Sequence, residues 1–259
     1  MRFNVNILFY FFLERFHLDI VCDVGSRDGV HSLKFRNLLP NARIIAFEAN
    51  PHNYDAMRSD QKLAQNKIEI VHKAVTNRAG RLTFHVLQLE NGVEEAWRTG
   101  GSSVHNRTDG LPTVPVEVES IRLDEFIESL DRAPQSVALW IDVEGAAYEV
   151  LEGIERIASR VQVLHVEVEA KETWAGQKVV TDIDALLKRL GFCFAGRGYG
   201  YQDIQYDVVY INRRTFKHSR LKVMWIIGLA VLVTYLERFG GSAYHRLKSG
   251  YLKSRSGGK

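Results

Sequence analysis

Residues 18–50 read LDIVCDVGSRDGVHSLKFRNLLPNARIIAFEAN. Two short apolar runs in this stretch flank a glycine-containing turn and a helical pattern, and an acid, Asp23 or Glu48, stands at the tip of each run. Short runs rich in Val and Ile are typical of strands that are buried on both faces. The stretch therefore predicts a strand, a loop, a helix and a second strand, a unit that suits a cofactor carrying a nucleoside.

The same alternation continues as far as Tyr210 and predicts an α/β fold, in which parallel strands are joined by crossover helices. We expect strands at residues 19–24, 42–47, 68–75, 137–141, 161–168 and 205–211, and helices at 29–38, 52–64, 123–130, 146–158 and 182–190. Residues 81–87 and 114–121 are expected to form an additional strand pair around a polar loop, 90–110. A loop this long inside a compact domain is usually functional or mobile.

The net charge of +3 hides an uneven distribution. From Asn212 onward there are 11 Lys or Arg and one acid, Glu237, giving +10, and subtraction from 34 and 31 leaves 23 basic and 30 acidic residues, giving −7. A nucleic-acid enzyme would more naturally carry its positive charge on the catalytic body, so we expect no nucleic-acid partner. A basic tail that flanks an apolar run points instead to anionic lipid.

Both ends of the chain carry an apolar segment. Residues 3–13 are followed by no small-residue cleavage site, so we expect residues 1–17 to pack on the edge of the domain rather than to contact a membrane. Residues 223–236 read VMWIIGLAVLVTYL. As a helix they rise only about 21 Å, short of the roughly 30 Å hydrocarbon core. With Trp225 and Tyr235 near its ends, the segment is more typical of a helix resting on a membrane than of one buried against the domain or a second subunit.

The chain is therefore divided into the N-terminal segment 1–17, a main domain 18–212 and a basic tail 213–259. Cys22 and Cys193 lie in apolar runs and provide neither a disulfide framework nor a metal-binding spacing. This pattern favours a reducing compartment, and we expect a cytoplasmic protein that associates with a membrane through the tail.

The first candidate site is the loop DVGSRDG, which contains Asp23, Gly25, Ser26, Arg27 and Gly29. It lacks the G-x-G-x-x-G spacing that dinucleotide oxidoreductases use to approach a pyrophosphate. A carboxylate near such a loop suits a cofactor without phosphates but with an amino group and a sulfonium, such as S-adenosylmethionine.

Glu48 ends the next strand, 23 residues after Gly25, where a carboxylate can accept hydrogen bonds from ribose hydroxyls. The competing interpretation of Glu48 is a solvated carboxylate at a strand end.

The second candidate site is LWIDVEG, residues 139–145, where a buried strand ends in Asp142 and Glu144. Ligands bind beyond the carboxyl ends of parallel strands, so these acids would face the reactive end of the cofactor. Glu167, in HVEVE on the neighbouring strand, completes the candidate catalytic set. Any of the three could take a proton from a substrate hydroxyl, as could His31 or His165. Alternatively, Glu144 balances a helix dipole and Glu167 is a solvated strand end. Ser102 and Ser103, in the polar loop, would orient substrate.

These segments together resemble the FkbM family of S-adenosylmethionine-dependent methyltransferases. The resemblance rests on DVGSRDG, AFEANP, GGSSV, VEVESIRLDEFI and above all IDVEGAAYEVLEGI, in family order, and it covers about residues 18–212. It implies a class I, Rossmann-like methyltransferase fold: a three-layer sandwich around a mostly parallel seven-stranded sheet whose last strand is antiparallel. It also implies methyl transfer to oxygen. By this resemblance Asp23, Gly25 and Gly29 line the cofactor loop, Glu48 holds the ribose, and Asp142 and Glu144 lie at the reaction centre.

Arg27, Trp140 and Ala147 depart from the residues that the family usually has at these positions. We predict an O-methyltransferase that acts on a hydroxyl of a sugar, lipid or secondary metabolite, without a metal. Three alternatives stay open: an enzyme whose paired acids hold a divalent metal, a non-catalytic membrane-apposed binding protein with the same fold, and a nucleic-acid methyltransferase.

Overall fold

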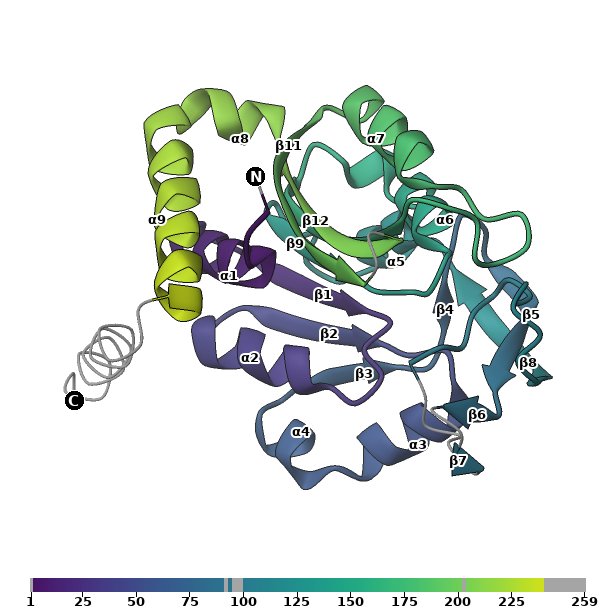
Figure 1. Cartoon of the computed structure of the whole chain (residues 1–259). Helices are drawn as coiled ribbons and strands as arrows, with labels where there is room; N and C mark the ends of the chain where they lie inside the picture. The colour runs from purple at the N-terminus through teal and green to yellow at the C-terminus, as the bar shows by residue number, and fades with distance from the viewer. Residues whose placement is uncertain (1, 91–92, 95–99, 202–203, 240–259) are drawn as a thin grey trace.

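The computed structural model describes residues 2–90, 93–94, 100–201 and 204–239, so part of the polar loop and of the basic tail lies outside the described residues. Seven strands form the main sheet, in the order β11-β12-β10-β9-β1-β2-β3 (Figure 1). They are β1 (Ile20–Val24), β2 (Arg43–Phe47), β3 (Glu69–Val71), β9 (Val137–Ile141), β10 (Val161–Glu169), β11 (Phe192–Tyr201) and β12 (Gln205–Asn212). Only β12 runs antiparallel to its neighbours, β10 and β11. The predicted mostly parallel seven-stranded sheet with an antiparallel last strand is confirmed.

Helices cover both faces of this sheet, which makes three layers (Figure 1). One face packs against α5 (Leu123–Glu128), α6 (Ala147–Glu152), a 3₁₀ turn (Glu155–Ile157) and α7 (Val180–Arg189). The other packs against α1 (Val5–Arg15), α2 (Val30–Leu38), α3 (Pro51–Ser59), α4 (Gln61–Gln65) and α9 (Arg220–Phe239), which follows the short α8 (Arg213–His218). Because the central strands are covered on both sides, β1 and β9 are buried at every position.

The predicted strand at 68–75 is divided between two sheets. Its first part is β3, and its last two residues form β4 (Ala74–Val75), which pairs with β8 (Thr113–Ile121) in a smaller sheet with β5 (Gly80–Leu87). A further short pair, β6 (Leu89–Glu90) and β7 (Val93–Glu94), follows β5. The apolar character is continuous across the division, so the composition of the run cannot show where the chain changes partner.

One strand was missed by the sequence prediction. In β11 the glycines Gly196, Gly198 and Gly200 alternate with larger residues, and glycine normally weakens a strand. The reason lies in α1 and the residues before it: a Cβ on Gly196 would lie 2.5 Å from the Phe3 ring, and one on Gly198 would lie 3.1 Å from Val5. The glycines admit the N-terminal segment to the sheet.

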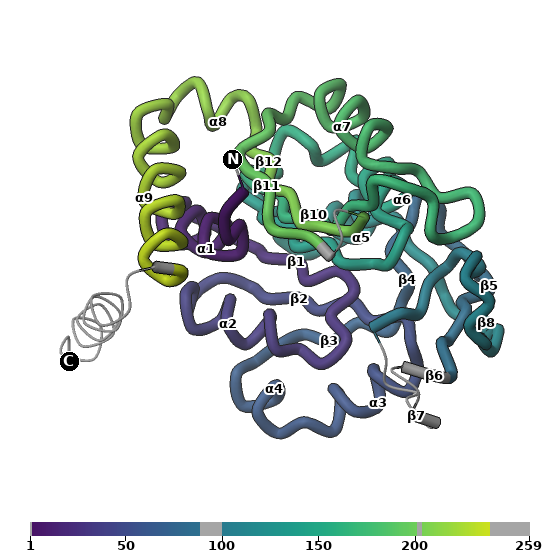
Figure 2. The backbone as a smooth tube through the Cα atoms, in the orientation of Figure 1, coloured from purple at the N-terminus to yellow at the C-terminus, as the bar shows by residue number. Residues whose placement is uncertain are grey.

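The two ends of the described chain lie side by side. Helix α1 packs on α9 (Figures 1 and 2), with a hydrogen bond from the backbone N–H of Asn4 to Thr234 Oγ1 at 3.0 Å and one from Lys222 Nζ to the Arg15 carbonyl at 2.7 Å. Helix α9 is longer than the predicted 223–236, because the helix continues through the charged residues on either side. No helix among the described residues is both long enough and apolar enough to cross a membrane.

Candidate active site

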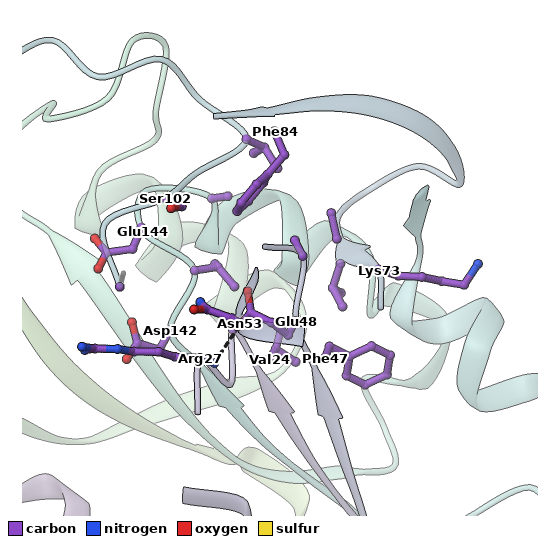
Figure 3. Close-up of a pocket in the computed structure, with 18 of the residues that line it drawn as sticks. Val24, Arg27, Phe47, Glu48, Asn53, Lys73, Phe84, Ser102, Asp142 and Glu144 are labelled. Atoms are coloured by element: carbon purple, nitrogen blue, oxygen red, sulfur yellow. Dashed lines mark hydrogen bonds between the residues drawn. The ribbon is translucent and has the colours of Figure 1, made fainter. Parts of the chain in front are cut away.

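Strand register brings the predicted site residues together. Val24 on β1 is level with Phe47 on β2 and with Ile141 on β9, so the residues that follow, Gly25, Glu48 and Asp142, leave the sheet at one edge. A cleft of about 290 Å³ opens there (Figure 3). Of the nine predicted site residues, six line this cleft: Gly25, Arg27, Glu48, Asp142, Glu144 and Glu167.

Gly25 fits the loop tightly against the reaction-centre strand. Its φ is +82°, and a Cβ placed there would lie 1.8 Å from the carbonyl oxygen of Asp142. The backbone N–H of Asp142 in turn donates to the Val24 carbonyl at 2.9 Å. Glycine is therefore required at this position by the neighbouring strand as well as by any ligand in the cleft.

The remaining predicted loop residues lie behind the cleft. Asp23 is 1% exposed, and its Oδ2 accepts hydrogen bonds from Ser26 Oγ at 2.8 Å and Ser32 Oγ at 2.6 Å. Burial raises the pKa of Asp23 to about 6 against the opposing effect of these two hydroxyls. Gly29 precedes α2 with a φ of +75°, and a Cβ there would lie 2.6 Å from the Leu63 side chain. These residues therefore fix the conformation of the loop and do not line the cleft.

Glu48 stands at the centre of the cleft (Figure 3). Its Oε2 accepts from the backbone N–H of Arg27 at 2.6 Å, and its Oε1 accepts from that of Asn50 at 2.8 Å. Arg27 adopts the left-handed conformation, with a φ of +58°, which turns its N–H toward the carboxylate. Burial raises the pKa of Glu48 to about 7, although both backbone hydrogen bonds favour the ionised form. The carboxylate is held in one orientation with lone pairs still available for a ligand.

Three further acids of the cleft, Asp142, Glu144 and Glu167, form a cluster. One oxygen from each lies within 4.8 Å of the others. Gln205 Nε2 donates to Glu167 Oε2 at 2.8 Å and to Glu144 Oε2 at 3.2 Å, so this amide bridges two of the acids. Asp142 and Glu167 also share a side-chain hydrogen bond, so the two carboxyls share a proton.

Burial and mutual repulsion hold protons in this cluster. Burial, followed by the charges of Asp142 and Glu169, raises the pKa of Glu144 to about 8. Burial is also the main reason that the pKa values of Asp142 and Glu167 are raised. Glu169, on the same strand as Glu167, has a pKa of about 7 for the same reason. Positive charge brought into the cleft would lower these pKa values and would itself be stabilised.

The two candidate histidines lie elsewhere. His31 and His165 stack on Trp140, with ring centroids 4.2 Å and 3.5 Å away, beneath α1, and neither lines the cleft. Burial lowers the pKa of His31 to about 4 and that of His165 well below its usual value, so both rings are neutral at pH 7. The structure therefore removes both histidines from the set of possible bases.

The polar loop is hydrogen-bonded to the turn that carries Glu144 and clamps it in place. Ser103 Oγ donates to the Glu144 carbonyl at 2.6 Å, and Ser102 Oγ accepts from the backbone N–H of Leu87 at 3.0 Å. Glu144 has a φ of +49°, a conformation that this clamp supports. Of the two serines, Ser102 lines the cleft.

Sequence reasoning missed two side chains in the cleft, Asn53 on α3 and Phe84 on β5. Asn53 is 2% exposed and hydrogen-bonds Glu48, and Phe84 lies across the cleft from it (Figure 3). The sequence offered only a weak signal for Asn53, an asparagine two residues after Pro51, which begins the helix, because its burial shows only in the structure. Lys73 also lines the cleft, but its ammonium group pairs with Glu119.

A family model described as the methyltransferase FkbM domain matches residues 23–194, about two thirds of the chain. This chain belongs to the FkbM methyltransferase family. The matched FkbM region begins at Asp23 and contains every residue that lines the cleft, from Val24 to Glu167.

The chain is also similar to three proteins that are named as methyltransferases. The 2-O-methyltransferase NoeI of Sinorhizobium fredii is 27% identical over 61% of this chain and 66% of its own length. Methyltransferase sdnD of Sordaria araneosa is 29% identical, over 66% and 73% respectively. The hexuronic acid methyltransferase AglP of Haloferax volcanii is 26% identical, over 59% and 56%. The chain thus matches somewhat under two thirds of the length of two of these relatives.

Proposed function

We propose that this protein is an S-adenosylmethionine-dependent O-methyltransferase whose acceptor is a hydroxyl on a sugar, lipid or secondary metabolite. The observation that supports this most is the arrangement of acids around one cleft, with Glu48 on the β2 side and Asp142, Glu144 and Glu167 on the β9 and β10 side. Two of the three relatives are named for methylation of a 2-hydroxyl or of a hexuronic acid, so a sugar acceptor is favoured.

The residues of the cleft fit this cofactor. Glu48 is buried and oriented by two backbone N–H groups, as a ribose-binding carboxylate needs to be. The acid cluster suits a ligand that carries an ammonium and a sulfonium. When bound, S-adenosylmethionine supplies a methyl group on a positively charged sulfur. The residues of the cleft then hold the reacting atoms in line, and positioning alone contributes up to roughly 7 to 11 kcal/mol in ideal cases.

We assign the general base to Glu144. Asp142 and Glu167 are engaged in a hydrogen bond with each other, whereas Glu144 takes no part in it. Burial raises the pKa of Glu144 to about 8, and a positively charged cofactor would lower it toward neutrality, where a base works best. Gln205 donates hydrogen bonds to both Glu144 and Glu167 and so keeps the Glu144 carboxylate in place.

Calorimetry with S-adenosylmethionine and the full chain tests the cofactor assignment. We expect binding by the wild type and none by Glu48→Ala. Failure of the wild type to bind would overturn the proposal and favour a binding protein that only retains the fold. Release of S-adenosylhomocysteine in the presence of a mixture of methyl glycosides tests the base: Glu144→Gln should lose about 10² to 10⁴ in rate. Glu155→Gln, on an exposed ion pair with Arg189, is the matched control.

The same assay, run in the presence of EDTA, tests whether the reaction depends on a metal ion. Carboxylate oxygens suit Mg²⁺ or Ca²⁺, but here Gln205 and the shared proton already hold the cluster together. We expect full activity in EDTA. Loss of activity in EDTA and its recovery on adding Mg²⁺ would assign the three acids to a metal.

We further propose that the protein works at an anionic membrane surface. One face of α9 packs on α1 and the sheet through Val223, Ile226 and Ala230. The opposite face exposes five large apolar residues, Leu221, Met224, Trp225, Leu232 and Tyr235, and Leu221 is 87% exposed. Basic residues stand at both ends of this face: Arg220 and Lys222 at the start of the helix, and Arg238 at its end. A helix with this pattern lies in the plane of an anionic bilayer.

Sedimentation with phosphatidylcholine vesicles, with and without phosphatidylserine, tests this surface. We expect the wild type to pellet with the anionic vesicles and the double variant Leu221→Ser, Trp225→Ser to stay in solution. Phe194→Ser, which alters an equally exposed ring on β11, is the control. Equal pelleting of wild type and double variant would contradict the proposal. A dimer that the double variant disrupts would assign the face to a second copy instead.

A further inference from the structure

A second hollow, of about 520 Å³, lies between the N-terminal end of α1, β11 and the C-terminal end of α9. Its volume is in the range of sites that bind small molecules. Its lining is Phe3, Asn4, Val5, Asn6, Gly198, Tyr199, Asp207, Thr234, Glu237 and Arg238. We call it the acceptor hollow. All ten residues lie outside the region 23–194 that the family model matches, so nothing in the family match accounts for it.

The acceptor hollow borders the acid cluster through one pair of residues. Asp207 on β12 lines the hollow, and it lies directly opposite Glu167 on β10, which lines the cofactor cleft. The side chain of Asp207 is 33% exposed, and His165 Nε2 lies 3.9 Å from its Oδ2. Burial and then the charge of Asp142 raise the pKa of Asp207 to about 7, as expected for an acid next to the cluster. A hydroxyl held at Asp207 would thus lie beside the group of acids where methyl transfer is proposed.

The walls of the hollow are held firmly. Residue Arg2 pairs with Arg197 of β11, and the Phe3 N–H donates to the Arg197 carbonyl at 3.2 Å. Thr234 Oγ1 accepts from the Asn4 N–H, and Asn6 Oδ1 lies 2.9 Å from His165 Nε2. The guanidinium of Arg238 lies over the ring of Tyr199, 5.5 Å from its centroid. These contacts tie a half-exposed aromatic ring to a set of polar groups, which is the chemistry that binds a sugar: apolar C–H faces against the ring and hydroxyls against the polar atoms.

We propose that the acceptor hollow binds the sugar ring of the acceptor, that Tyr199 and Asp207 are its main contacts, and that this ring carries no negative charge. The inference rests on the proposed function, because it takes the acid cluster as the place of methyl transfer. Like charges that meet at an interface are strongly unfavourable. A carboxylate on the ring would meet two acids in the hollow itself, Asp207 and Glu237, against one basic residue, Arg238. The chain would therefore differ in acceptor from its hexuronic acid relative.

Two ligands that share a ring and differ in charge test the proposal: methyl β-D-glucopyranoside and methyl β-D-glucopyranosiduronate. Each is titrated into the full chain saturated with S-adenosylhomocysteine, followed by saturation-transfer NMR. We expect the neutral glycoside to bind and the uronate to bind at least about tenfold more weakly at pH 7.5. Tyr199→Ala should weaken the neutral glycoside, and Asp207→Asn should narrow the difference between the two ligands. Phe194→Ala, which alters a ring on β11 that contacts Tyr210 and does not line the hollow, should change neither.

Each outcome bears on a separate part of the proposal. Equal binding of the uronate would overturn the requirement for a neutral ring. Binding that Tyr199→Ala and Asp207→Asn leave unchanged would overturn the location, and no binding of either glycoside would overturn the sugar class. Failure of the proposed function would look different, because S-adenosylhomocysteine itself would then not bind in the preceding titration.

Discussion

The cofactor cleft and the acceptor hollow are built in different ways. The cleft is lined by residues 24–167, at the ends of parallel strands, and its main contacts are short and involve the backbone: Arg27 to Glu48, Asn50 to Glu48, Ser103 to Glu144. The hollow is lined by two helices and a hairpin whose lining residues the family model does not cover. The difference is that the family match covers every residue of the cleft and none that line the proposed acceptor site.

The largest expected effect on cofactor affinity comes from Gly25, where the cofactor loop packs against the end of β9. Gly25→Ala would place a Cβ 1.8 Å from the Asp142 carbonyl, which cannot be relieved without moving β9. We expect at least a hundredfold loss of affinity for S-adenosylmethionine, measured by calorimetry. Gly176→Ala is the matched control, because Gly176 has a similar φ of +78° with open space around it. It should cost only about 1 kcal/mol of stability. Equal affinities in the two variants would show that close packing at Gly25 is not required for cofactor binding.

The next prediction tests whether cofactor binding and glycoside binding depend on different residues. Glu48→Gln keeps the shape of the side chain but turns an amide toward the N–H of Arg27 or Asn50. A hydrogen bond to a charged group contributes about 1.5–3 kcal/mol, so affinity for S-adenosylmethionine should fall about 10- to 100-fold. Glycoside binding in the acceptor hollow should not change. Glu119→Gln, on an exposed ion pair with Lys73, serves as control, and a parallel loss of glycoside binding would contradict the separation of the two regions.

The buried acids in and behind the cleft should also make the stability of the protein depend on pH. Burial raises the pKa of Asp23 to about 6, of Glu48 to about 7 and of Glu144 to about 8, above their values in the unfolded chain. The folded protein therefore binds protons more tightly, and its free energy of unfolding should decrease as the pH rises from 5 to 8. A pKa that is higher by one in the folded chain than in the unfolded chain corresponds to about 1.4 kcal/mol. Thermal unfolding of the ligand-free protein measures the slope, which Glu48→Gln should reduce. A melting temperature that rises over this range would contradict the prediction.

The smallest effect concerns the contact between the two flanking helices. Thr234→Val removes the hydroxyl that accepts from the Asn4 N–H and should cost about 1 kcal/mol of stability. Glycoside affinity should fall a few-fold, because Asn4 and Thr234 both line the hollow, while cofactor affinity stays constant. Thr83→Val removes an exposed hydroxyl hydrogen bond to Glu117 instead. If both variants behaved alike, the hollow would not depend on this contact.

Most of the cofactor cleft was predictable, because its residues follow from where parallel strands end. Glu48 and Asp142 each come directly after a buried strand, and strand ends in such a sheet meet at one edge. The acceptor hollow was not predictable, since β11 has a glycine at every second position in its outer half and reads as a loop. Its glycines make sense only when Phe3 and Val5 are in place, and these residues are almost 200 positions away in the chain. The two candidate histidines failed for a related reason: the sequence could not show that α1 covers them.

The hydrogen bond between Asn4 and Thr234 joins residues 230 positions apart. Thr234, Glu237 and Arg238 come at least 40 residues after the last matched residue, 194, so they are added to the growing chain after the whole matched region. The acceptor hollow is therefore the last site of the described chain to be completed. A growing chain in which the cofactor cleft has already formed still lacks one wall of the hollow until α9 has been translated.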